Sequence, residues 1–481
     1  MDLLAFSSVK ELREKIQKKE LSPNEVVAYS LKRIEAHNKK LNAVIEAFDS
    51  SSMDIPVDNS TLPLAGVPGL AKDVICQKDR ITSCSSKILA NFVPPYDATT
   101  VKRLKDAGAS FVGRTNCDEF AMGASNETSA YGPVFNPWDL TRSSGGSGGG
   151  SAASVAAGLV PWALGTETGG SVRQPACFCG IVGSKPTYGL LSRYGLIAYG
   201  SSLDAVGINT RTVYDNALLM GIMAGVDERD STSARLKGPF DYVKGLTGKI
   251  RPGLRIGVIT NAVQAKGIET GVAKALDAAL EELKKLGAEL VDIALPTMDY
   301  GAAVYFMVSR AEVASNLSRF DGVRYGHRTA DAVDLRDMYE KTRGEGFGHE
   351  AKRRILIGNF VLSAGHADQY YESACTVRRM MRAEMMDAFK KVDLLFAPVS
   401  AAPAFKVGEL GDPLQMDLQD YFTCPANLAN IPAVSVPCGF VDNMPVGFQL
   451  MGPDFAEGLI FETLHAYEQA TPWHTMHPKG F

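Results

Sequence analysis

SSGGSGGGS at residues 143–151 and GTETGGS at residues 165–171 are the two stretches that decide the fold of this chain. Glycine lets the backbone adopt strained turns and approach a ligand closely, so serine hydroxyls in this setting suggest nucleophilic catalysis. No histidine occurs between His37 and His327. If one of these serines is a nucleophile, its base need not be an imidazole.

Three interpretations of residues 143–151 compete with catalysis. A flexible Gly/Ser linker should separate two domains, but this stretch runs directly into SAASVAAGLVPWALG, which predicts a small-residue helix followed by an apolar strand. A phosphate-binding loop needs Gly-Lys-Ser/Thr at its end, and the next lysine is Lys185. A dinucleotide fingerprint fails because Ser151 replaces its third glycine and no clear strand precedes the turn. All three interpretations are therefore weak.

A nucleophile elbow is a further alternative, because residues 145–149 (GGSGG) match the G-x-S-x-G pattern of α/β-hydrolases. The histidine that such an enzyme needs could be His465, His474 or His477. An elbow also requires a hydrophobic strand immediately before it, whereas residues 136–142 (NPWDLTR) are polar and rich in turn formers. An α/β-hydrolase is therefore the weaker interpretation.

Short apolar runs alternate with helical patterns along most of the chain, which predicts an α/β protein with a mixed, largely buried sheet. A clear helix spans residues 272–285 and ends at Gly287. The expected strands lie at residues 67–75, 110–112, 254–259, 290–293, 394–396 and 433–436. The four expected segments are a helical arm (1–60), a core (61–299), a mainly helical insertion (300–392) and a continuation of the core (393–481).

Two helices are expected within residues 8–40 of the arm. Ser22 is placed to cap the second helix, Pro23 fits its first position, and Glu25 is the capping-box partner. The simplest role for this segment is packing against the core.

The composition excludes several function classes. Fifty basic and 54 acidic residues give a formal charge of −4, so net charge does not indicate a surface for polyanions. The longest gently apolar stretch, residues 152–165, is too short to cross a bilayer, and the N-terminus lacks a signal-peptide pattern. We therefore expect a cytoplasmic protein with no membrane partner. Its eight cysteines are expected to be reduced, and a lone CxC at residues 177–179 is weak evidence for a metal site.

Lys72 offers a base that requires no histidine. It ends the apolar run GVPGLA at residues 66–71, where burial would favour the neutral amine. A second serine between base and nucleophile can relay a proton over a gap that one hydrogen bond cannot span. Taken one at a time, a surface lysine and tight-turn packing explain Lys72, Ser147 and Ser171 better. Only the lysine base explains both glycine-rich stretches together.

This combination resembles the amidase signature family, whose enzymes use a Ser-Ser-Lys triad, and the similarity covers nearly the whole chain. It implies a large mixed β-sheet covered by helices on both faces. Matched to the family motif, Lys72 is the base, Ser147 the bridging serine that follows a cis peptide bond, and Ser171 the nucleophile. The family usually reads GGSSGGS, and Gly148 replaces the second serine here, which puts a secondary hydrogen bond in doubt.

Three stretches resemble one branch of that family, the glutamine-hydrolysing subunits of tRNA-dependent amidotransferases. The resemblance implies that glutamine is hydrolysed through an acyl-enzyme and that the ammonia converts Glu-tRNA(Gln) to Gln-tRNA(Gln). A free-standing amidase for small amides is the alternative, and a non-catalytic assembly protein is a third hypothesis. The three stretches are DEFAMGASNETSAYGPVFNPWD (118–139), GEGFGHEAKRRILIGNF (344–360) and CPANLANIPAVSVPCGF (424–440).

The same resemblance assigns residues that hold the substrate. Arg354 would bind the α-carboxylate of glutamine, although the adjacent Arg353 leaves this assignment open by one residue, and Asp420 would bind the α-ammonium. Backbone N–H groups in a glycine nest would stabilise the oxyanion. The residues expected to form this oxyanion hole are Thr168, Gly169 and Gly170.

The resemblance also implies partners, which are the B and C subunits of the amidotransferase. The B subunit would activate Glu-tRNA(Gln) with ATP and Mg²⁺ and make most of the tRNA contacts, and the small C subunit would complete a heterotrimer. We expect no cofactor in this chain, because it shows neither a phosphate loop nor a metal-ligand cluster. Arg173 and Glu119 are expected to be structural, in a salt bridge and at the start of a helix.

Overall fold

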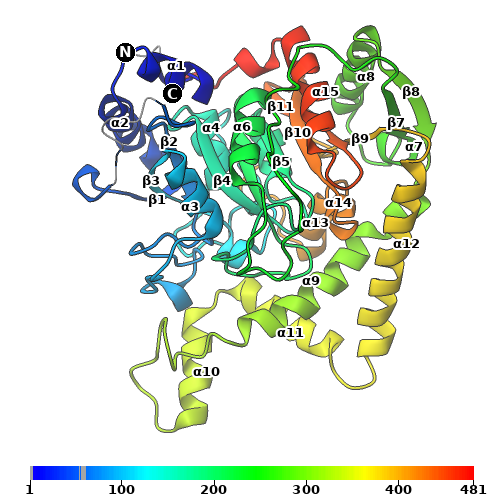
Figure 1. The fold of residues 1–481 in the computed structure, drawn as a ribbon. Helices are drawn as coiled ribbons and strands as arrows, with labels where there is room; N and C mark the ends of the chain where they lie inside the picture. The colour runs from blue at the N-terminus through cyan, green and yellow to red at the C-terminus, as the bar shows by residue number, and fades with distance from the viewer. Residues whose placement is uncertain (1–3, 54, 56–60) are drawn as a thin grey trace.

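The structure is a computed structural model and describes residues 4–53, 55 and 61–481. Across these residues one mixed sheet of 11 strands crosses the molecule in the order β1-β3-β2-β4-β6-β5-β10-β11-β9-β7-β8 (Figure 1). The predicted α/β class is therefore confirmed. The strands are β1 (Val44–Ala47), β2 (Pro68–Lys72), β3 (Ser110–Thr115), β4 (Trp162–Glu167), β5 (Val182–Lys185), β6 (Ala205–Thr210), β7 (Arg255–Ile259), β8 (Glu289–Ile293), β9 (Leu394–Pro398), β10 (Ala433–Val441) and β11 (Met444–Met451).

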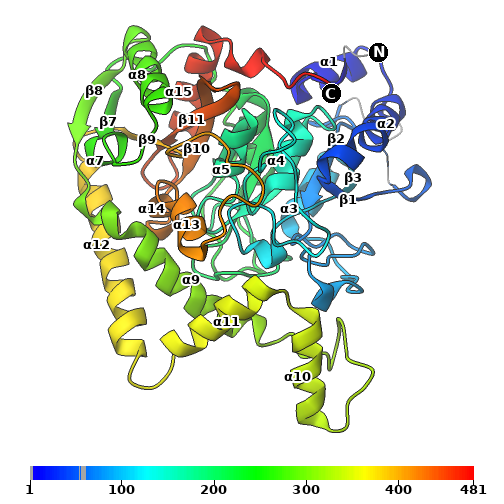
Figure 2. The same ribbon diagram turned by 180° about the vertical axis from the view of Figure 1, so that it is seen from behind.

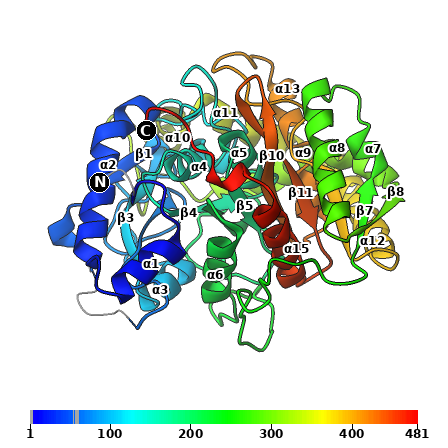
Figure 3. The same ribbon diagram turned by 90° about the horizontal axis from the view of Figure 1, so that it is seen from above.

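Helices cover both faces of this sheet, as expected. Figure 3 shows α4 and α5 on one face and α6 and α15 on the other. In the part of the chain that the structure describes, no helix is long and apolar enough to cross a membrane. The α-helices are α1 (Val9–Gln17), α2 (Pro23–Leu41), α3 (Thr99–Asp106), α4 (Gly149–Ala156), α5 (Arg173–Cys179), α6 (Val213–Met223), α7 (Thr260–Val263), α8 (Thr270–Lys285), α9 (Gly301–Leu317), α10 (Leu335–Gly346), α11 (His349–Val361), α12 (Ser373–Ala388), α13 (Pro413–Asp417), α14 (Cys424–Leu428) and α15 (Glu457–Ala470).

The N-terminal arm has the two expected helices, α1 and α2. Ser22 caps α2 and exchanges hydrogen bonds with Glu25 in the predicted capping box. The arm is not only helical, because β1 pairs antiparallel with β3 at the edge of the main sheet. Backbone hydrogen bonds therefore join this segment to the core, which the helical pattern of residues 8–40 did not indicate.

Four helices, α9 to α12, form a layer at one end of the sheet, within the segment predicted to be mainly helical (Figures 1 and 2). Helices α9 and α11 pack very closely, because a Cβ at Gly358 would lie 2.0 Å from the carbonyl oxygen of Arg310. Only glycine fits there without a backbone shift. The layer brings basic side chains of α9 and α11 toward the turns that follow the central strands.

Candidate active site

The site lies where two parallel neighbours, β2 and β4, end. Ala71 is in register with Leu164, so the next residue of β2, Lys72, lies beside the carboxyl end of β4. The GTETGGS stretch continues from β4 into a turn before α5, and the SSGGSGGGS stretch leads into α4. Because loops that follow parallel strands meet at one edge of a sheet, both stretches converge on Lys72.

Lys72 and Ser147 are in direct contact. The amine Nζ of Lys72 donates a hydrogen bond to Ser147 Oγ at 2.7 Å, and Lys72 has no exposed surface. Burial lowers the pKa of Lys72, although the nearby Cys117 and Asp118 oppose this shift. The peptide bond between Gly146 and Ser147 is cis, as the family resemblance implied. The lysine therefore has the environment of a proton acceptor.

The two serine-bearing segments are joined through their backbones. Gly148 N–H donates to the carbonyl oxygen of Ser171 at 3.1 Å. A Cβ at Gly148 would lie 2.6 Å from that same oxygen and 3.7 Å from Lys72 Nζ. The departure from the family pattern at this position thus coincides with a close approach of the Ser171 carbonyl, which leaves no room for a serine unless the backbone shifts.

A buried ion pair fixes the turn that carries Ser171. Glu167 accepts hydrogen bonds from the backbone N–H groups of Val172 and Arg173, and its other oxygen binds the Arg173 guanidinium. Both side chains are fully buried. This matches the structural role expected for Arg173.

The proposed oxyanion hole is lined by glycines that lie against other side chains. Among the hydrogen bonds of the described residues, none uses the backbone N–H of Gly169 or Gly170. A Cβ at Gly169 would lie 2.5 Å from the Tyr305 ring, and one at Gly170 would lie 2.7 Å from Asp420 Oδ1. The backbone can therefore approach a substrate here only because both positions lack a side chain.

Asp420 is a buried acceptor without a partner. Its Oδ1 atom makes no hydrogen bond within the described residues. Burial raises the pKa of Asp420 to about 7, although the positive charge of Arg354 opposes the shift. An unpaired buried carboxylate is costly, so this atom is suited to a cationic ligand group.

Arg353 and Arg354 differ sharply in their surroundings. Arg354 is buried and donates to the Tyr199 hydroxyl at 2.8 Å, and it also donates to Glu350 at 2.6 Å. The Arg353 side chain is 22% exposed and makes two hydrogen bonds to Glu350, both 2.7 Å long. Both arginines line a cavity of about 490 Å³ together with Ser125. Arg354 is therefore the more deeply buried of the two arginines, and its charge acts on Asp420.

The sequence did not identify the residues that hold Arg354 in place. The Tyr199 hydroxyl accepts hydrogen bonds from both Arg354 and Arg310, and Arg310 also pairs with Asp417. These residues come from separate segments and share no local motif. One signal was available in the sequence: Arg310 is the only basic residue of the mainly apolar helix α9.

Asp204 is a second residue that the sequence did not single out. Its carboxylate accepts a hydrogen bond from Thr168 Oγ1 at 2.6 Å and from the N–H groups of Tyr199 and Gly200. One buried carboxylate therefore connects the turn after β4 to the tyrosine that binds Arg354. Burial raises the pKa of Asp204 to about 6, although its hydrogen bond from Thr168 opposes this shift.

The α/β-hydrolase alternative is wrong. Residues 136–148 contain only isolated bridges and no strand, so the required elbow is absent there. His465, His474 and His477 line a different cavity together with Lys10 and Arg211. The base that contacts Ser147 is a lysine.

The part of the chain that the structure describes is held together without a disulfide. It contains no group of three or more His, Cys, Asp or Glu that could hold a metal ion. All eight cysteines are free, and seven are buried. Burial raises the pKa of Cys177 to about 12, so this thiol is protonated at neutral pH.

Comparisons with known proteins show the family of this chain. A family model described as Amidase matches residues 25–461. A chain from Carboxydothermus hydrogenoformans, named as the A subunit of glutamyl-tRNA(Gln) amidotransferase, is 50% identical, over 99% of both chains. A protein of the same name from Geobacillus stearothermophilus is 48% identical, over 98% of both chains.

Solved structures are also similar to this chain. The crystal structure of the A subunit of glutamyl-tRNA(Gln) amidotransferase from Thermotoga maritima is 39% identical, with a TM-score of 0.83, and the match covers 99% of this chain and 97% of that one. A structure of 6-aminohexanoate cyclic dimer hydrolase is 26% identical with a TM-score of 0.84, over 99% of both chains. This chain belongs to the amidase signature family.

Proposed function

We propose that this chain is the glutamine-hydrolysing subunit of a tRNA-dependent amidotransferase. Relatives about half identical over nearly their whole length are named as the A subunit of glutamyl-tRNA(Gln) amidotransferase. The observation that carries the proposal is the hydrogen bond from the buried Lys72 to Ser147, beside the turn that bears Ser171. It supplies a base for amide hydrolysis without histidine.

The proposed reaction begins when Ser171 Oγ attacks the side-chain carbonyl carbon of glutamine. The proton of Ser171 passes to Ser147, and the proton of Ser147 passes to the neutral amine of Lys72. Backbone N–H groups of residues 168–170 stabilise the oxyanion. The relay then returns a proton to the leaving nitrogen, so that ammonia departs and a γ-glutamyl ester remains. Water attacks this ester through the same relay and releases glutamate.

The opposite charges of Arg354 and Asp420 support glutamine as the substrate. Arg354 binds the α-carboxylate and the unpartnered Oδ1 of Asp420 binds the α-ammonium, which leaves the side-chain amide directed at Ser171. A small aliphatic amide has neither charge. It would leave the buried Oδ1 atom of Asp420 without a partner, which is costly.

The ammonia is used by partners. We propose a heterotrimer in the cytoplasm, in which the B subunit activates Glu-tRNA(Gln) with ATP and Mg²⁺ and the small C subunit completes the complex. This chain itself uses no cofactor and makes few contacts with tRNA. The support for these partners comes from the names of the relatives.

The test is glutaminase activity of the purified chain, alone and with its partner subunits. We expect the activity to rise with the partners and to disappear in Ser171→Ala. Full activity in Ser171→Ala would disprove the proposal. Faster hydrolysis of aliphatic or aryl amides than of glutamine would favour a free-standing amidase instead.

A further inference from the structure

A second cavity lies between α1 and the C-terminal part of the chain, on the side of the molecule where both termini are found (Figure 1). Its volume is about 510 Å³. Its lining is rich in groups that are or can become cationic. These are Lys10 of α1, Arg211 before α6, His465 of α15, and His474 and His477 near the C-terminus.

Arg211 is the central observation, because its guanidinium is incompletely hydrogen-bonded within the described residues. Its guanidinium lies over the Phe6 ring, 5.2 Å from the centroid, and its buried Nη1 atom has no hydrogen-bond partner within the described residues. No ion pair within the described part of the chain involves it. Burial lowers the pKa of Arg211 to about 10, so it remains a cation at neutral pH. A buried guanidinium nitrogen without an acceptor is costly to maintain.

The other basic groups reinforce this positive field. Lys10 Nζ lies over the Tyr214 ring, 4.9 Å from its centroid. His465 Nδ1 is buried and has no partner within the described residues. Burial lowers the pKa of His465, and the charges of Lys10 and His474 lower it further. The neutral imidazole of His465 is therefore favoured in this cavity.

The acidic groups nearby are all engaged elsewhere. Glu11 accepts hydrogen bonds from the backbone and hydroxyl of Ser8. Asp215 binds the first N–H groups of α1. Burial raises the pKa of Glu468 to about 8, although its hydrogen bond from Val213 opposes the shift, so this carboxyl is mostly neutral at pH 7. The charges of Asp215 and Glu11 partly offset the burial of Arg211, but among the hydrogen bonds of the described residues neither carboxylate accepts one from its guanidinium.

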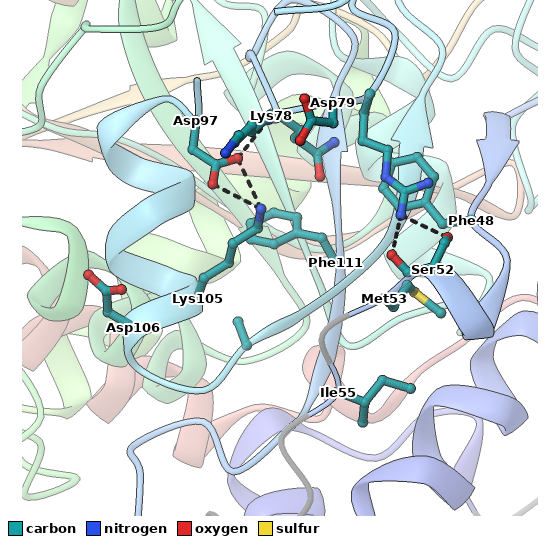
Figure 4. Close-up of a pocket in the computed structure, with 13 residues that line it drawn as sticks. Phe48, Ser52, Met53, Ile55, Lys78, Asp79, Asp97, Lys105, Asp106 and Phe111 are labelled. Atoms are coloured by element: carbon teal, nitrogen blue, oxygen red, sulfur yellow. Dashed lines mark hydrogen bonds and ion pairs between the residues drawn. The ribbon is translucent and has the colours of Figure 1, made fainter. Parts of the chain in front are cut away.

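In a different cavity, the basic side chains have acceptors for their hydrogen bonds. It has a volume of about 880 Å³ and also contains several cations (Figure 4). There, Lys105 pairs with Asp97 at 2.9 Å, and Arg80 donates to the carbonyl oxygen of Ser52 at 2.6 Å. In that cavity the cations have acceptors, whereas around Arg211 three buried nitrogen atoms lack a partner within the described residues: Arg211 Nη1, His465 Nδ1 and His474 Nδ1.

We infer that the cavity around Arg211 binds a phosphate group. A guanidinium fork and imidazole N–H groups match the several acceptor oxygens of a phosphate dianion, and Lys10 adds a second full charge. The Phe6 face is already stacked on His477, with 4.0 Å between ring centroids, so no free aromatic face is available for a base. The ligand is therefore recognised by its phosphate and not by stacking. This inference does not depend on the proposed amidotransferase activity.

The experiment is a titration of the full-length chain with inorganic phosphate and, separately, with AMP, at constant ionic strength. Binding is followed by thermal unfolding and by the NMR resonances of the histidines, with His465→Gln used to assign one of them. We expect phosphate to raise the unfolding temperature and to raise the pKa of His465, because a dianion favours the imidazolium form. Tighter binding of AMP would identify a phosphate monoester as the ligand, and equal or weaker binding would identify free phosphate.

Two variants and a control make the test specific. Arg211→Gln should weaken phosphate binding by about tenfold or more, as expected for the loss of a charge-assisted hydrogen bond. Lys10→Gln, at an exposed position, should weaken it less and guards against misfolding of the first variant. Arg229→Gln is the matched control, because Arg229 also lies over an aromatic ring but is already paired with Asp227.

The inference is overturned by either of two results. One is that millimolar phosphate and AMP leave the unfolding temperature and the histidine resonances unchanged. The other is that Lys10→Gln and a cooperatively unfolding Arg211→Gln bind phosphate as tightly as Arg229→Gln does.

Discussion

The two halves of the candidate active site are built in different ways. The reaction centre draws Lys72, Ser147 and Ser171 from the ends of neighbouring strands and the turns that follow them, and its contacts are hydrogen bonds between side chains and between backbone groups. The substrate-holding half draws Arg354 and Asp420 from later segments of the chain, and its contacts are between buried charges. The chemistry thus depends on the geometry of hydrogen bonds, whereas recognition of glutamine depends on the packing of ionised groups. Substitutions in the first half should lower kcat, and those in the second should raise KM.

The largest effect is expected for Lys72→Met. The substitution keeps the buried volume but removes the proton acceptor, so kcat for glutamine should fall by about four orders of magnitude while KM changes little. Lys185→Met is the matched control. Lys185 is also buried, and burial lowers its pKa to about 7, but its Nζ donates to the Pro186 carbonyl and not to a serine. Similar losses in both variants would show that burial of any lysine matters, and not the contact with Ser147.

A large but different effect is expected for Asp420→Asn, which should raise KM for glutamine by about 100-fold with a smaller change in kcat, because the ammonium loses its buried counter-charge.

The wild type should also show a pH dependence. Since burial raises the pKa of Asp420 to about 7, the carboxylate is protonated as the pH falls below that value, and KM should rise. Steady-state kinetics from about pH 8 to about pH 6 measure both effects. If the KM of Asp420→Asn rises as much as that of the wild type when the pH falls, the group that titrates is not Asp420.

An intermediate effect is expected for Asp204→Asn, which joins the two halves. The amide fits the same space but has only one acceptor oxygen, so the hydrogen bonds from Thr168 and Tyr199 cannot both be kept. We expect kcat to fall and KM to rise together, with kcat/KM down by up to about 100-fold. Thermal unfolding serves as the control for a general loss of stability. A change in stability alone, with normal kinetics, would show that Asp204 does not link the two halves.

The smallest effect is expected for Arg353→Gln. Its guanidinium is partly exposed and bound to Glu350, so KM should change by less than about threefold, as is usual for a partly solvated ion pair. Arg354→Gln, one residue along, should raise KM by more than about tenfold because the glutamine carboxylate would lose a buried counter-charge. The reverse order would move the carboxylate site to Arg353.

The sequence predicted locally encoded elements better than long-range contacts, for a physical reason. Glycine-rich turns and capping boxes are local, and the helix α2 with its Ser22 cap and the helix-then-strand pattern after Ser151 are present as expected. Strands β1, β5, β6 and β11 were not predicted. Strands β5 and β6 carry Gly, Ser, Asn or Thr, so no alternation marks them, and they form only because neighbouring strands supply hydrogen bonds on both sides.

The contacts of the substrate-holding half were also not predictable from local sequence patterns. Arg354 and Asp420 were assigned from resemblance, and no pattern linked them to Tyr199, Arg310 or Asp417. These contacts arise from the packing of α9 against α11 and of residues 417–420 against both, which is a property of the folded chain. A charge network of this kind becomes visible only when burial removes the water that would otherwise solvate each group.

The most direct test of the reaction centre is mass spectrometry of the chain after reaction with a glutamine-like electrophile that leaves a stable adduct. A single adduct is expected on the peptide that contains Ser171. It should be lost in Ser171→Ala and form much more slowly in Lys72→Met, where the proton acceptor is missing. An adduct on Ser147, or one that forms at the same rate without Lys72, would contradict the roles assigned to the three residues.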